Sequence, residues 1–171
     1  MIRTEQVQDY SQVDKLLRNA FNGDEEVHIV ERIRAQGDYE PNLSLVADND
    51  GAITGHIMFS YAQLIDGQKS YKVAGLAPLA VDPSYQRKGI GSALIHEGLE
   101  RCRQFDIPLV FLIGHPEYYS RFDFVKAVDY GFELKQFEVP DEVFMVYEVQ
   151  AGALNRYKGE LRYSKAFFNQ E

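Results

Sequence analysis

The chain has one cysteine, no low-complexity tract and no apolar run long enough to cross a bilayer. The single Cys102 excludes an internal disulfide, and its place on the apolar face of a predicted helix favours burial as a small hydrophobe over a catalytic thiol. Residues 1–13 alternate polar and apolar side chains, so we expect no secretory signal. These absences together predict a cytoplasmic protein in a reducing compartment, without a membrane partner.

Acidic residues outnumber lysine and arginine and give the chain a formal net charge of −8. Such a surface repels the phosphates of DNA and RNA on average, so we expect no nucleic-acid partner. With 171 residues, 45% hydrophobic and 26% charged, the chain has the size and composition of one globular domain. Apolar residues continue beyond residue 150, so we expect 151–171 to pack on the domain formed by 1–150.

The segment Gln86–Gly91 (QRKGIG) stands between an apolar strand-like run and a stretch with helical periodicity. The first amides of a helix have no partner within it, and the helix dipole adds positive charge there, so an anion is favoured. Gly89 and Gly91 let a ligand approach the backbone, while Arg87 and Lys88 add positive charge. The context favours a pyrophosphate site, although a glycine pair alone is also typical of an ordinary turn.

Two other phosphate-binding motifs are excluded. The dinucleotide fingerprint needs a third glycine three residues after the second, and that position holds Leu94. The P-loop needs glycine, four residues and then Gly-Lys-Ser/Thr, which no stretch of the chain supplies. A nucleotide-binding fold of either kind is therefore not indicated.

Strand-like and helix-like stretches predict an α/β protein with a mixed sheet. The turn at 49–51 (NDG) joins two apolar stretches in a hairpin, and a second turn at 66–67 (DG) leads into a third strand. The sheet therefore begins as an antiparallel meander. The predicted strands are 2–6, 43–47, 53–59, 71–81, 108–113 and 143–150, and the predicted helices are 10–21, 24–37 and 90–105.

Pro78 lies inside the predicted 71–81 strand. Proline cannot donate to a sheet ladder and is usually found at edges or bulges, so we expect a gap in the ladder there. The connection from Val81 through the helix to Val110 should be parallel and right-handed. Ligands of such units bind at the carboxyl ends of the strands, where Asp82 and Gly114 stand.

QRKGIG resembles the Q/R-x-x-G-x-G/A signature of the GCN5-related N-acetyltransferases (GNAT), in which this loop holds the pyrophosphate of coenzyme A. LAPLAVDPSYQRKGIGSALI and GHPEYYSRFDF are similar to the bacterial YhbS-like subgroup. The resemblance implies the GNAT fold, a mixed sheet of about seven strands flanked by about four helices. It implies acetyl-CoA as cosubstrate and no metal. Its implied contacts to acetyl-CoA are Leu79, Ala80, Val81, Gln86, Arg87, Lys88, Gly89, Ile90, Gly91 and Ser92.

A tyrosine near the thiol sulfur serves the resembled family as general acid. Tyr118, Tyr119, Arg121 and Phe124 match the family pattern around it, which implies Tyr119 as the acid. Asp123 stands where the family has glycine. Because aspartate reaches positive φ less readily than glycine, we expect this residue to alter the turn and the aim of Tyr119.

The base that would take a proton from the acceptor is less clearly indicated. The 71–81 strand contains no carboxylate, which leaves His56, His115 and Glu117 as candidates. A lone histidine is more often a structural hydrogen-bonding residue, and a chain of water molecules is the alternative.

The resemblance implies an N-acetyltransferase that passes the acetyl group of acetyl-CoA to an amine by direct attack in a ternary complex. The acceptor is a small molecule or a protein amino group, and the net charge weakly favours cationic acceptors. The alternative is a protein that binds acetyl-CoA without turnover, as a sensor or an interaction module. A homo-oligomer is compatible with the sequence.

Overall fold

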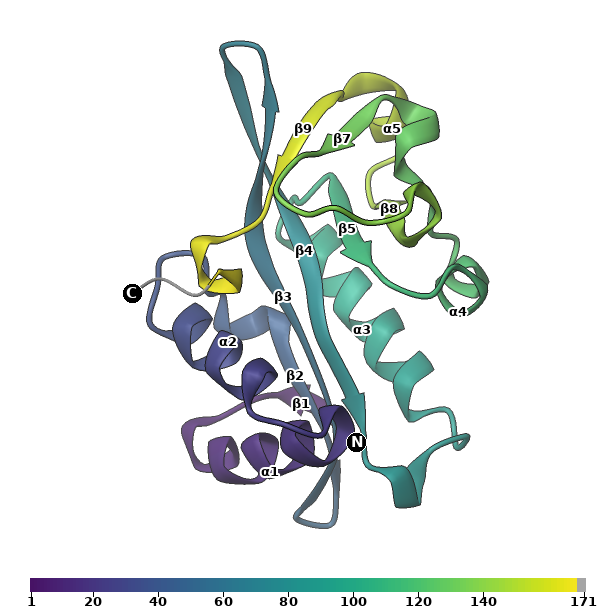
Figure 1. Cartoon of the computed structure of the whole chain (residues 1–171). Coiled ribbons are helices and arrows are strands. Elements are labelled where there is room, and N and C mark those ends of the chain that lie inside the picture. The colour runs from purple at the N-terminus through teal and green to yellow at the C-terminus, as the bar shows by residue number, and fades with distance from the viewer. Residues whose placement is uncertain (169–171) are drawn as a thin grey trace.

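The computed structural model describes residues 1–168, and the last three residues of the segment 151–171 lie outside the described part. Within residues 1–168 the chain forms one mixed sheet of nine strands, ordered β1-β2-β3-β4-β5-β8-β6, with β9 pairing with β3 and β7 (Figure 1). The strands are β1 (Ile2–Thr4), β2 (Ser44–Asn49), β3 (Ala52–Asp66), β4 (Lys69–Val81), β5 (Leu109–Ile113), β6 (Val125–Lys126), β7 (Phe132–Leu134), β8 (Phe144–Glu148) and β9 (Gly159–Arg162).

Three long helices and two short ones flank this sheet. The sheet and the long helices confirm the predicted α/β fold, and the additional strands β6, β7 and β9 are short. The helices described within residues 1–168 are α1 (Tyr10–Phe21), α2 (Glu25–Arg34), α3 (Ile90–Gln104), α4 (Pro116–Tyr119) and α5 (Ala153–Arg156).

The meander β2-β3-β4 is built on two tight turns. Asp50 and Gly51 both have positive φ, 52° and 92°, which is the geometry of a two-residue hairpin turn. Gly67, with φ 61°, lies in the next turn between β3 and β4. The predicted antiparallel start of the sheet is thus confirmed.

The predicted break at Pro78 is also confirmed. Ile57 pairs with Leu79 but Phe59 pairs with Leu76, so β4 carries one extra residue in a bulge at 77–78. The parallel ladder between β4 and β5 joins only Ala74 to Val110 and Gly75 to Phe111 among the described residues. Beyond Gly75, β4 therefore continues without β5 as a hydrogen-bonding neighbour.

Helices cover both faces of the central strands. On β2 and β3, alternate residues such as Leu45 and Ile57 pack with α3, while Val46 and Met58 pack with α1 and α2. Figure 1 shows α1 and α2 on one side of the sheet and α3 on the other. A Cβ on Gly98 of α3 would lie 2.1 Å from Cε1 of Phe59, so α3 packs on β3 at a distance that only glycine permits.

The last part of the described chain packs on this body. Strand β9 runs antiparallel to β3, with Gln63 opposite Arg162, and parallel to β7. The following turn, residues 165–167, reaches α2, where Nε of Arg32 donates to the carbonyl of Ala166 at 2.9 Å. Residues 159–168 are thereby joined to both the sheet and the helical layer.

Candidate functional site

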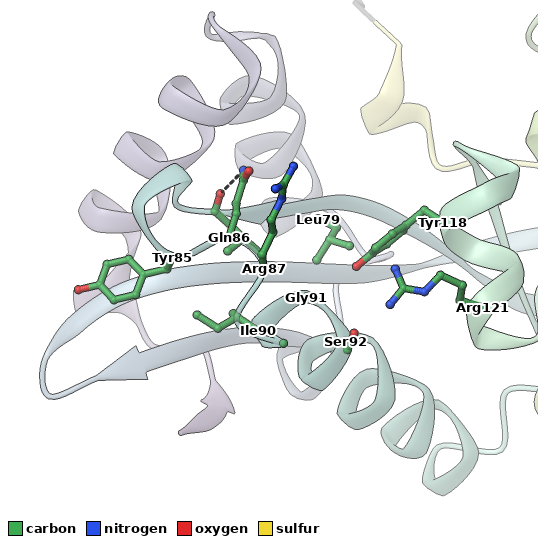
Figure 2. Close-up of a pocket in the computed structure, with 11 residues that line it drawn as sticks. Leu79, Tyr85, Gln86, Arg87, Ile90, Gly91, Ser92, Tyr118 and Arg121 are labelled. Atoms are coloured by element: carbon green, nitrogen blue, oxygen red, sulfur yellow. Dashed lines mark hydrogen bonds between the residues drawn. The ribbon is translucent and has the colours of Figure 1, made fainter.

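A cavity of about 450 Å³ lies where β4 ends and α3 begins. Its walls come from the end of β4, the loop that follows it, the first turn of α3 and the segment around α4 (Figure 2). The lining residues are Leu79, Val81, Tyr85, Gln86, Arg87, Gly89, Ile90, Gly91, Ser92, Tyr118 and Arg121.

The loop between β4 and α3 is held by hydrogen bonds at its start. Oδ1 of Asp82 accepts from the amide of Ser84 at 2.8 Å, which caps a short turn at Pro83–Tyr85. Nε2 of Gln86 donates to the carbonyl of Val81 at 3.3 Å, which ties the loop back to the end of β4. The loop therefore enters α3 along a defined path.

Two residues with positive φ turn the backbone into the helix. Arg87 has φ 66° and Gly89, the N-cap of α3, has φ 81°. The carbonyl of Gly89 accepts the helical bond from Ala93 at 3.0 Å, so the amides of residues 90–92 precede the first donor of that ladder. Left-handed residues in such a turn form a concave group of amides that binds anions. Holding a non-glycine residue in this conformation costs about 1 kcal/mol, and residues strained in this way are common at functional sites.

Gly91 is required for a different reason. Its backbone is helical, but a Cβ at this position would lie 2.7 Å from the hydroxyl oxygen of Tyr118 and 3.7 Å from Cγ2 of Val81. Glycine thus leaves room in the cavity between α3 and the tyrosine. A Cβ on Gly89 would meet nothing within 4 Å, so that position needs glycine for its φ alone.

Eight of the ten residues predicted to contact acetyl-CoA line the cavity, and Ala80 and Lys88 do not. Ala80 is 3% exposed and its side chain packs under α1 and α2, because alternate residues of β4 face opposite sides of the sheet. Lys88 lies beside a neighbouring hollow of about 400 Å³, with its ammonium 5.3 Å from the ring centroid of Tyr85. The cationic side chains that line the cavity itself are those of Arg87 and Arg121.

The two adjacent tyrosines of α4 occupy different positions. Tyr118 lines the cavity, whereas Tyr119 is not among its lining residues and is partly buried, with its ring centroid 5.0 Å from that of Tyr118. A Cβ on Gly114, just past the end of β5, would lie 2.7 Å from Cε2 of Tyr119. Burial raises the pKa of Tyr119 to about 12, and it also raises that of Tyr118. Both phenols therefore keep their protons at neutral pH.

Asp123 ends the short turn after α4 with φ 67°, in the left-handed region, and its amide donates to the carbonyl of Ser120 at 3.2 Å. Aspartate thus adopts here a conformation that glycine reaches more easily. The left-handed conformation of Asp123 costs about 1 kcal/mol, and the packing of buried Phe122 and Phe124 on either side of it offsets that cost.

None of the three candidate bases lines the cavity. His56 has no exposed surface and belongs to a buried polar cluster, where its Nε2 lies 3.3 Å from Oγ of Ser44 and 3.5 Å from Oε2 of Glu5. Burial, and to a lesser extent the charge of Arg34, lowers the pKa of His56 to about 3. These observations disfavour His56 as the base. His115 and Glu117 are exposed at the start of α4.

Arg34 completes this buried cluster beneath α2. Its guanidinium donates to Oε2 of Glu5 at 2.7 Å and lies 3.7 Å from the ring centroid of Tyr10. Oγ of Ser44 donates to the other oxygen of Glu5 at 2.9 Å. The cluster joins α1 and α2 to the sheet.

Cys102 is fully buried on the sheet side of α3, and burial raises the pKa of its thiol, so the predicted structural role is confirmed. In residues 1–168 no three His, Cys, Asp or Glu side chains are grouped as metal ligands. Over the same residues, no helix has the length and apolar character that a membrane span needs.

Sequence reasoning missed three residues of the cavity wall: Tyr85, Tyr118 as a lining residue, and Arg121. Tyr118 and Arg121 stand in the aromatic and basic stretch GHPEYYSRFDF, which marked the segment but not the direction of each side chain. Tyr85 directly precedes QRKGIG, and its place next to that loop was the available signal.

Comparison with known proteins adds a family to this geometry. Residues 1–127 match the family model described as "Acetyltransferase (GNAT) domain". The chain is 33% identical over 168 residues to the uncharacterized N-acetyltransferase YhbS of Escherichia coli K12, covering 98% of each chain. It is 35% identical over 135 residues to the uncharacterized N-acetyltransferase YjhQ of the same strain, covering 78% of this chain and 74% of YjhQ.

Two solved structures are similar over almost the whole chain. The structure of Escherichia coli YhbS in complex with CoA has a TM-score of 0.90 and 32% identity, and the match covers 98% of this chain and 91% of that one. A GNAT family acetyltransferase from Brucella melitensis, in complex with acetyl-CoA, has a TM-score of 0.78 and 29% identity over 98% of this chain and 97% of that one. The resemblance read from QRKGIG is confirmed by these matches.

Proposed function

The chain belongs to the GNAT family of N-acetyltransferases, and on that premise we propose that it transfers the acetyl group of acetyl-CoA to an amine, of a small molecule or of a protein. One observation carries the proposal: the cavity at the start of α3 lies against the part of β4 that has separated from β5. The anion site and the free edge of β4 are thus adjacent. Acetyl-CoA needs this arrangement, because its pyrophosphate and its pantetheine thioester are parts of one molecule.

The donor is proposed to bind along this surface. Its pyrophosphate lies against the amides of residues 90–92, and its pantetheine arm runs beside Leu79–Val81, where the main chain has no β5 partner. Ala80 takes part through its backbone alone, because its side chain faces α1 and α2. The thioester end then lies farther back along β4, toward the bulge at 77–78 and the end of β5.

The chemistry is proposed as direct attack. The neutral amine nitrogen forms a bond to the thioester carbonyl carbon, and the C–S bond breaks as the tetrahedral intermediate collapses. A main-chain amide of β4, between the bulge at 77–78 and Val81, stabilises the oxyanion. Tyr119 donates a proton to the leaving thiolate and regains one from water, a role supported by its contact with Gly114 beside the separated strands and by the protonated state of its partly buried phenol. The ammonium proton leaves through water.

A second candidate is an acetyl-CoA-binding sensor without turnover. It is favoured by the cavity wall within residues 1–168, where the titratable side chains are tyrosine and arginine, neither of which is a base at neutral pH. An acetyltransferase whose acceptor amine is already deprotonated when it binds needs no base in the cavity wall. The lack of a base therefore does not separate the two candidate functions, and only a measurement of turnover does.

Release of free thiol from acetyl-CoA, measured across a panel of small amines and amine-bearing peptides, tests the proposal. Acceptor-dependent release supports the acetyltransferase. Tight binding of acetyl-CoA with no release above the acceptor-free background, for every member of a broad panel, supports the sensor.

Two features of the organisation follow from the same evidence. We propose that residues 151–168 belong to the acetyltransferase domain itself, since β9 pairs with β3 and the 165–167 turn contacts α2. A cytoplasmic location is proposed on the buried, reduced Cys102. The net charge of −8 weakly favours cationic acceptors over anionic ones.

A further inference from the structure

Arg121 approaches the cavity from the wall that faces α3. It lies in the short turn Ser120–Phe122 after α4, some thirty residues after the QRKGIG loop in sequence. The buried rings of Phe122 and Phe124, 6% and 2% exposed, fix the backbone that directly follows it. The arginine is therefore an exposed side chain on a firmly packed turn.

The guanidinium of Arg121 points toward the first turn of α3. Figure 2 shows it beside the hydroxyl of Tyr118, near Ser92. Its Cζ lies 5.6 Å from the ring centroid of Tyr118 and 5.8 Å from that of Phe122. No carboxylate of residues 1–168 lies within 4.0 Å of it, whereas Arg3, Arg18, Arg34, Arg101, Arg103 and Arg162 all have such a partner.

Three sources of positive potential therefore converge on one cavity of an acidic protein. These are the amides at the start of α3, Arg87 beside them, and Arg121 on the facing wall. Like charges that face each other across a cavity repel unless an anion lies between them. A guanidinium presents a rigid fork of donors that matches two phosphate oxygens, which an ammonium does not.

We propose that Arg121 is a phosphate ligand for the donor nucleotide and makes the protein specific for thioesters of coenzyme A over thioesters of pantetheine alone. This inference rests on the proposed function, because it takes the ligand of the cavity to be acetyl-CoA. Two phosphate groups of the donor fit the chemistry, the pyrophosphate and the 3′-phosphate, and both would lie between Arg121 and the helix start.

The test compares three donors with three proteins. Calorimetry measures the affinities of acetyl-CoA, 3′-dephospho-acetyl-CoA and acetyl-pantetheine for the wild type, for Arg121→Gln and for Arg103→Gln. Arg103 is an exposed arginine paired with Glu100 far along α3, so its variant matches the change in charge. Thermal unfolding verifies that all three proteins are folded.

We expect Arg121→Gln to weaken acetyl-CoA binding about 10- to 100-fold, as for loss of a charged hydrogen bond, and to leave acetyl-pantetheine unchanged. Arg121→Lys, added as a fourth protein, should recover part of the loss. A loss confined to acetyl-CoA assigns Arg121 to the 3′-phosphate, and an equal loss with dephospho-acetyl-CoA assigns it to the pyrophosphate.

Equal affinities of Arg121→Gln and the wild type for both phosphate-bearing donors would overturn the inference while leaving the proposed function intact. Failure of the wild type to bind acetyl-CoA would instead overturn the proposed function, and the inference with it. Equal losses in Arg121→Gln and Arg103→Gln would also count against the inference, because they reflect net charge rather than a site.

Discussion

Replacing His56 by glutamine would isolate a pH dependence that arises in the buried cluster beneath α2. The imidazole is fully buried, and its pKa falls from 6.5 to about 3. The unfolded chain takes up a proton near pH 6.5, whereas the native state does so only near pH 3. The native state therefore loses stability relative to the unfolded chain as the pH falls through this window.

The size of the effect follows from the two pKa values. One bound proton contributes about 1.4 kcal/mol for each pH unit inside the window, so His56 accounts for about 2 kcal/mol of lost stability between pH 7 and pH 5. Burial raises the pKa of Glu5, which gives the opposite slope, and since Glu5 remains buried beside Arg34 in both proteins, most of this slope is common to the two. Glutamine cannot take up the proton, so the variant should lack the histidine contribution.

Urea unfolding followed by circular dichroism at pH 7, 6 and 5 measures the difference. We expect the advantage of the wild type over His56→Gln to shrink by about 2 kcal/mol between pH 7 and pH 5. His115→Gln, at an exposed histidine, is the matched control and should follow the wild type. If His56→Gln loses stability in acid as steeply as the wild type, the conclusion that His56 is buried in its neutral form is wrong. Thiol release at pH 7 should survive in folded His56→Gln, because His56 lies outside the cavity.

Two further pairs of substitutions test the packing and the chemistry. Gly98→Ala places a Cβ 2.1 Å from the ring of Phe59 and should lower the free energy of unfolding in urea by about 2 kcal/mol. Gly23→Ala, whose Cβ would meet nothing within 4 Å, should lower it by less than about 1 kcal/mol. Equal losses in the two variants would contradict the close packing of α3. Tyr119→Phe should lower kcat about 100-fold and change the KM for acetyl-CoA by no more than about threefold. Tyr118→Phe should keep most of kcat. If Tyr118→Phe instead shows the larger loss, the general acid is Tyr118 in the cavity wall.

The anion-binding loop could be predicted because its signals are local. A strand that ends at Val81, two glycines and a periodic apolar stretch lie within 25 residues, and Gly89 has the positive φ that glycine adopts readily in an anion-binding turn. Local signals do not fix where each side chain points. The backbone turns at Arg87 and Gly89 carry Lys88 to the neighbouring hollow, and strand alternation carries Ala80 to the opposite face.

The facing wall of the cavity depends on tertiary structure. Tyr118 and Arg121 reach it because β5 places α4 next to the start of α3, and no spacing in the sequence measures that distance. The burial of His56 depends on tertiary structure in the same way. Helices α1 and α2 cover its face of β3, and nothing local in the sequence shows that they do.

Calorimetric titration with acetyl-CoA, comparing the wild type with Gly91→Glu and Gly37→Glu, tests the proposed donor site most directly. A carboxylate about 4 Å from a phosphate costs about 4 kcal/mol at an effective dielectric constant of about 20, so Gly91→Glu should weaken binding at least about 100-fold. Gly37 lies in open space after α2, and its variant should bind like the wild type. Wild-type affinity in a folded Gly91→Glu protein, or no binding by the wild type, would contradict the proposal that acetyl-CoA occupies this cavity.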